Sequence, residues 1–77
     1  MLSGFLDELL DQNRNSLNPE SGECQICYLL TPVKNSHKPE YNIAIVALSA
    51  DDRILRVIKS IPLSDAISTI LKNLPNA

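Results

Sequence analysis

The run YNIAIVALS, residues 41–49, constrains the fold of this chain more than any other stretch of its sequence. It is rich in branched aliphatic side chains, which favour extended backbone because they fit a pleated surface. Two further runs with strand character, residues 23–31 and 53–61, lie on either side of it, and short turn-rich segments separate the three. Such links suit antiparallel pairing, since parallel strands need a long crossover. The sequence therefore predicts a three-stranded antiparallel sheet.

Helical patterns flank the three strand-like runs. Residues 3–14 and residues 62–74 each repeat apolar side chains at helical spacing. A chain of 77 residues has the size of one small domain. Because two amphipathic helices can cover only one face of a three-stranded sheet, we expect a two-layer α+β domain of α-β-β-β-α order that spans residues 1–77.

The expected strands do not alternate cleanly between apolar and polar side chains, as strands of a two-layer domain usually do. If Ile43 and Ile45 face the helices, the residues between and after them face away and are also apolar. Scattered exposed aliphatics are common and need no partner, but a run of them on adjacent strands predicts a protein interface. The interface residues expected on this outer face or on the edge of the third strand are Ala44, Val46, Leu48, Arg53, Leu55 and Val57.

The third strand-like run should follow the same period of two. Regular alternation places Ile54, Arg56 and Ile58 on one face and Leu55 and Val57 on the other. If this strand lies at an edge of the sheet, its free backbone groups could pair with a second copy of the chain. Self-association through the sheet face or this edge is the simplest form of the predicted interface.

Charge and composition weigh against several classes of protein. The net charge is −2 and the seven basic residues are spread singly along the chain, whereas domains that grip phosphates are usually strongly basic. No apolar run is long enough to span a bilayer, so we expect no membrane partner. Two cysteines without a disulfide framework or a targeting segment predict an intracellular location, cytoplasmic or nuclear.

One CxxC pair raises the question of a metal site. Cys24, Cys27 and His37 make three potential zinc ligands, but a structural zinc site needs four. Residues three apart on a strand also point to opposite faces, so we interpret the cysteines as separate thiols. Zinc completed by a carboxylate or a second chain stays open as a weaker alternative, as does redox chemistry.

No catalytic arrangement stands out in the sequence. His37, the only histidine, has no nucleophile and orienting acid near it in sequence, and the chain has no glycine-rich phosphate loop. The carboxylates resemble neither a metal loop nor a catalytic pair. We therefore expect no enzyme and no cofactor.

The order of the expected elements resembles that of the double-stranded-RNA-binding domain over nearly the whole chain. In the first expected helix, the segment LDEL at residues 6–9 looks like the family's Leu-Asn-Glu-Leu. In the first interstrand link, His37, Pro39 and Tyr41 resemble the family's Gly-Pro-x-His…Phe pattern. The resemblance implies minor-groove contacts from this helix and this loop. The residual RNA-contact candidates are Glu8, Lys34, His37 and Lys38.

The family's third contact, a cationic start of the second helix, is missing. The family opens that helix with Lys-Lys-x-Ala-Lys, whereas alignment on Ala66 puts the uncharged or acidic segment LSDAI, residues 63–67, in its place. Asp65 would repel phosphate, and without cations most of the counterion-release contribution to affinity is lost. The resemblance therefore implies a degenerate member that binds duplex RNA weakly or not at all.

Degenerate members of that family act as protein-interaction domains. We therefore expect a non-catalytic interaction and dimerisation module, an adaptor in RNA processing or silencing whose partner is a protein, most simply a second copy. Two alternatives stay open. The chain could be a weak binder of duplex RNA, or a small inhibitor from a phage or mobile element that blocks a host nuclease, which its size and acidity also fit.

Overall fold

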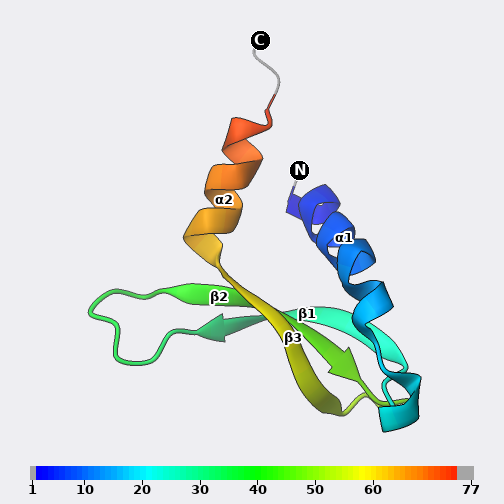
Figure 1. The fold of residues 1–77 in the computed structure, drawn as a ribbon. Helices are drawn as coiled ribbons and strands as arrows, with labels where there is room; N and C mark the ends of the chain where they lie inside the picture. The colour runs from blue at the N-terminus through cyan, green and yellow to red at the C-terminus, as the bar shows by residue number, and fades with distance from the viewer. Residues whose placement is uncertain (1, 75–77) are drawn as a thin grey trace.

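The computed structural model describes residues 2–74 and has the predicted α-β-β-β-α order (Figure 1). Two short 3-10 turns, η1 and η2, connect the first helix to the first strand. Each helix and strand begins and ends within two residues of its predicted bounds. The element order and the antiparallel sheet confirm the predicted two-layer α+β fold. In chain order the elements are α1 (Leu2–Asn13), η1 (Arg14–Ser16), η2 (Pro19–Ser21), β1 (Gln25–Pro32), β2 (Tyr41–Leu48), β3 (Ile54–Pro62) and α2 (Leu63–Lys72).

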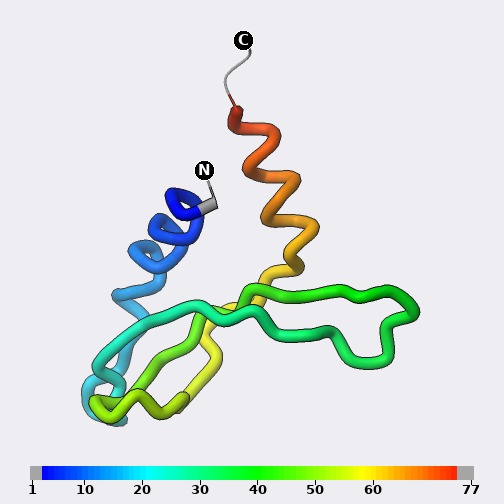
Figure 2. Tube along the Cα trace, turned by 180° about the vertical axis from the view of Figure 1, so that it is seen from behind, coloured from blue at the N-terminus to red at the C-terminus, as the bar shows by residue number. Residues whose placement is uncertain are grey.

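The sheet is antiparallel with the strand order β1-β2-β3, so β2 is its centre and the other two strands are its edges. Ile45 of β2 lies opposite Tyr28 of β1 and Lys59 of β3. Both helices lie on one side of this sheet, as Figures 1 and 2 show from opposite directions. Between residues 2 and 74 the other face carries no helix, which is the arrangement that the sequence predicted.

The core that joins helices and sheet is small. Its buried members come from one face of α1, from the helix side of β2 and from the first turns of α2. Ile45 has no exposed surface at all, and the burial of such a side chain contributes about 1.5–3 kcal/mol. The buried members of this cluster are Leu6, Leu9, Ile43, Ile45 and Ala66.

The molecule is extended for its length. Its Cα radius of gyration is 14.2 Å and its principal extents are 45 × 33 × 16 Å. A compact domain of 77 residues has a radius of gyration of about 11.5 Å. Figure 1 shows the cause, because the β1–β2 hairpin projects to one side while α1 and α2 rise away from the sheet.

Two irregularities in β3 change which side chains share a face. The register between β2 and β3 shifts between Ile45 and Val46 and again between Ala47 and Leu48. Val57 therefore lies opposite Val46, and Ile54 lies opposite Leu48.

The regular alternation predicted for this strand is thus wrong. Ile54 shares a face with Val57 instead of with Arg56, which lies opposite Ala47. The physical reason is that each bulge adds one residue to β3 and so reverses the alternation beyond it.

Candidate protein-interaction surface

The central strand contributes less to the outer face than its sequence predicts. Ala44 and Val46 point away from the helices, since they alternate with Ile43 and Ile45, yet their exposed fractions are only 4% and 1%. Side chains of both edge strands flank them on this face. The expectation that these two residues expose apolar surface is therefore wrong, and Leu48 is half-buried.

The edge strand β3 carries three exposed apolar side chains: Ile54 and Val57 lie on that face, and Leu55 is the extra residue of the bulge beside Ile54. The exposed fractions of Ile54, Leu55 and Val57 are 55%, 42% and 56%. Leu29 of β1, opposite Ala44, is 36% exposed on the same face. We call these four residues the outer patch. Leu55 and Val57 were predicted as interface residues, but Ile54 was not, because nothing in the sequence reveals the bulge that turns it outward.

The strand that carries this patch has a free edge. Within residues 2–74, β3 pairs with β2 alone, so the backbone groups along its other side have no strand opposite them. Such an edge can accept a further strand from another chain. The outer patch and the edge of β3 therefore form one continuous candidate interface.

Arg53, another predicted interface residue, belongs to the turn that leads into β3. Its Nε lies 3.1 Å from Asp51 Oδ2, and both side chains are largely exposed. The Ser49 hydroxyl donates to the Asp51 carboxylate, which lowers the pKa of Asp51, and accepts a hydrogen bond from the Arg53 amide at 3.1 Å. These contacts define the turn, and they leave Arg53 exposed at the end of the outer patch.

An ion pair between an exposed arginine and a buried carboxylate ties β3 to the linker between α1 and β1. Arg56 donates from Nε and Nη2 to the two carboxylate oxygens of Glu23, both at 2.9 Å, and from Nη2 to the Ser16 carbonyl at 2.8 Å. The Asn18 amide also donates to Glu23 at 2.9 Å. The Arg56 hydrogen bonds, helped by that amide, lower the pKa of Glu23 from 4.5 to about 2.

This ion pair is structural. The Glu23 side chain is only 4% exposed, and every oxygen of its carboxylate has a charged donor. A two-pronged guanidinium–carboxylate contact fixes geometry as well as charge. Sequence reasoning missed it, because residues 33 positions apart carry no local signal of their contact.

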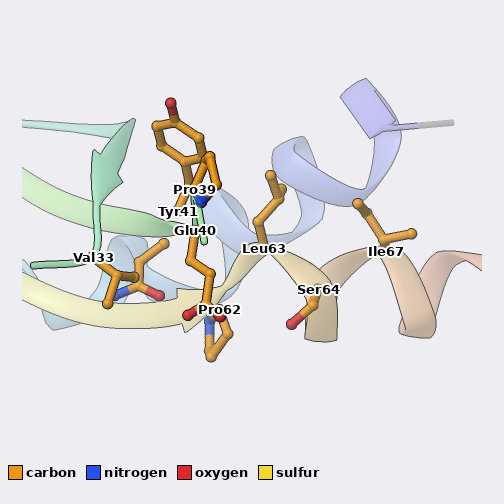
Figure 3. Close-up of a pocket in the computed structure, with 9 residues that line it drawn as sticks. Val33, Pro39, Glu40, Tyr41, Pro62, Leu63, Ser64 and Ile67 are labelled. Carbon is orange, nitrogen blue, oxygen red and sulfur yellow. The ribbon is translucent and has the colours of Figure 1, made fainter. Parts of the chain in front are cut away.

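A groove of about 530 Å³ opens at the opposite end of the strands, between the hairpin and the start of α2 (Figure 3). Figure 3 shows that Tyr41, Leu63 and Ile67 project to the same side. Apolar side chains dominate its lining, beside the polar Glu40, Asn42 and Ser64. We call this groove the notch, lined mainly by Val33, Pro39, Tyr41, Pro62, Leu63 and Ile67.

The residual RNA-contact candidates fall at two places. Lys34, His37 and Lys38 are exposed together in the link between β1 and β2, which we call the hairpin tip, residues 33–40. Glu8 is exposed on α1, and Figures 1 and 2 both show the hairpin tip projecting away from that helix. The first turn of α2 carries an acid, Asp65, as the sequence predicts.

The three weak metal-ligand candidates do not meet. Cys24 precedes β1 and its Sγ lies 3.5 Å from the Gly22 carbonyl, while His37 lies beyond the other end of β1. Cys27 Sγ lies 3.5 Å from the Tyr28 carbonyl. Across residues 2–74, no three His, Cys, Asp or Glu side chains are grouped so that they could hold a metal ion.

No known protein family, no curated protein and no solved structure matches this chain. Neither of the two helices between residues 2 and 74 is long and apolar enough to cross a membrane. Interpretation of the surface therefore depends on its own geometry and chemistry.

Proposed function

We propose that this chain is a non-catalytic protein-interaction and dimerisation module. The observation that carries the protein-interaction role is the outer patch, where three aliphatic side chains between 42% and 56% exposed lie along a strand with a free edge. Contiguous apolar surface beside a free strand edge is typical of sites where another chain docks. The resemblance to degenerate double-stranded-RNA-binding domains supports a role as an adaptor in RNA processing or silencing.

The distribution of charge favours protein over RNA as the partner. Lys34 and Lys38 are the only cations of the exposed hairpin tip, and the start of α2 offers Asp65 where a phosphate contact would need a cation. Duplex RNA is held by phosphate and 2′-OH contacts made at successive grooves at once. With one set of contacts missing, we expect weak duplex RNA binding at most.

Sedimentation of the wild-type chain together with a duplex titration tests this proposal. We expect self-association at micromolar concentration and little binding to a duplex of about 16 base pairs, even at low salt. A chain that stays monomeric and binds the duplex with a steep salt dependence would instead establish an RNA-binding domain.

A further inference from the structure

Apolar side chains line both sides of the angle between the hairpin and α2. On the helix side, Ile67 is 47% exposed and Leu71, one turn further along, is 61% exposed. On the hairpin side, Tyr41 is 45% exposed and Leu30 is 60% exposed. Leu30 lies opposite the core residue Ile43, so it is on the face of the sheet that carries the helices. Figure 1 shows that neither helix of residues 2–74 lies over the projecting hairpin.

We infer that the notch seats a second copy of this chain, with α2 of each copy lying on the hairpin of the other. Each chain has both an apolar helix stripe and an apolar hairpin surface, set at an angle to each other. A two-fold axis through the notch brings each stripe onto the other hairpin, which is the self-complementary arrangement that a symmetric dimer requires. The extended shape and small core of a single chain are what such a contact would complete.

Charge complementarity supports the same occupant. The hairpin tip carries Lys34 and Lys38 beside a single carboxylate, Glu40, and so has a net positive charge, whereas α1 carries three carboxylates and no cation. Figures 1 and 2 show the tip on one side of α2 and α1 on the other, and residues of α1 and α2 line a shared cleft. A two-fold axis through the notch therefore carries each cationic tip toward the acidic α1 of the other copy.

This inference rests on the proposed function, because it names the partner and the surface of the dimerisation step. It assigns the second copy to the notch and leaves the outer patch, on the other face of the sheet, free for a different protein. The two surfaces lie on opposite sides of β2, so substitutions can address them separately.

Matched substitutions on the two surfaces test the assignment. Ile67→Lys places a cation in the notch, and Leu71→Lys places one a turn further along the same apolar stripe of α2; we call these two the notch variants. Val57→Lys places a cation in the outer patch. All three side chains are about half exposed or more, so the fold should persist, and circular dichroism with thermal unfolding verifies this for each variant. We expect the dimer dissociation constant, measured by sedimentation, to rise at least about tenfold for each notch variant and to stay unchanged for Val57→Lys.

The possible outcomes separate the two proposals. If Val57→Lys dissociates the dimer and the notch variants do not, the assignment to the notch is overturned while self-association stands. If the wild-type chain is monomeric at every concentration, both the notch dimer and the dimerisation role are overturned.

Charge reversal tests the two-fold geometry. One variant carries Lys34→Glu and Lys38→Glu, and the other carries Asp7→Lys and Glu8→Lys. Alone, each should dimerise more weakly than the wild type, because like charges then meet at both tips. A one-to-one mixture should form a heterodimer tighter than either homodimer. A mixture no tighter than its components would overturn this arrangement of the two copies.

Discussion

On the face of the sheet that carries the helices, the two ends of the sheet differ in how completely side chains of the same chain cover and pair one another. At one end, Arg56 and Glu23 complete each other's hydrogen bonds and join β3 to the linker after α1. At the other end, Tyr41 and Ile67 line the same open groove and remain about half exposed. The first end is closed by contacts within one chain, and the second is open.

This difference separates structural residues from binding residues. A buried charge must be paired, so the Arg56–Glu23 ion pair is explained by the fold alone. Exposed aliphatic side chains grouped around a groove gain nothing from the fold of one chain, and their burial requires another molecule. The open end is therefore where we place the contact with a second copy.

The largest expected effect contrasts two isoleucines, one from the core and one from the open end. Ile45→Ala removes a side chain with no exposed surface, so the free energy of unfolding should fall by about 2–5 kcal/mol. Ile67→Ala, in the notch, should change the free energy of unfolding by no more than about 0.5 kcal/mol, measured at concentrations low enough to keep the chain monomeric. Urea unfolding of both variants measures the contrast. An equal loss of unfolding free energy in both variants would mean that Ile67 belongs to the core of a single chain.

The ion pair at the closed end should contribute more to stability than a surface pair. Arg56→Ala leaves the nearly buried Glu23 without its charged donor, so the unfolding midpoint should drop clearly. Arg53→Ala is the matched control, because its pair with Asp51 is exposed on both sides, and such pairs contribute little. Thermal unfolding of the two variants compares them. A drop for Arg53→Ala as large as that for Arg56→Ala would contradict the structural role assigned to Arg56.

The same ion pair should make stability depend on acid pH. The pKa of Glu23 is lowered from 4.5 in the absence of its partners to about 2 in the fold, so its contribution is fully present above about pH 4.5. That contribution should be lost as the pH falls from there through about 2. The free energy of unfolding, measured across this range, should depend less steeply on pH for Glu23→Gln than for the wild type. Part of the remaining pH dependence should come from Asp51, whose pKa is also lowered. An unchanged slope for Glu23→Gln would contradict the role of this carboxylate.

The order and bounds of the elements could be predicted from the sequence because they depend on local periodicity. The same period of two predicted that Ile43 and Ile45 share one face of the sheet, and the structure places both in the core. Which face each β3 residue occupies could not be predicted, since a bulge depends on pairing with β2 and leaves no mark in the sequence. The outward position of Ile54 was missed for this reason.

The candidate surfaces were predictable only in part. The sequence shows that Val46 and Val57 are apolar, but their exposure depends on strand order, because a central strand has a neighbour on both sides and an edge strand has one. The notch arises where the end of β3 runs directly into α2 beside the hairpin, a tertiary arrangement without a local pattern. The pairing of Arg56 with Glu23 is also a tertiary contact that no local sequence pattern predicts.

The most direct test of the account detects contacts between copies at the open end. An isotope-filtered nuclear Overhauser experiment on a mixture of labelled and unlabelled wild-type chains reports only protons on different chains. We predict cross-peaks from the methyl groups of Ile67 and Leu71 to the ring of Tyr41 and the methyls of Leu30. A dimer whose only intermolecular cross-peaks come from Ile54, Leu55 and Val57 would contradict the account.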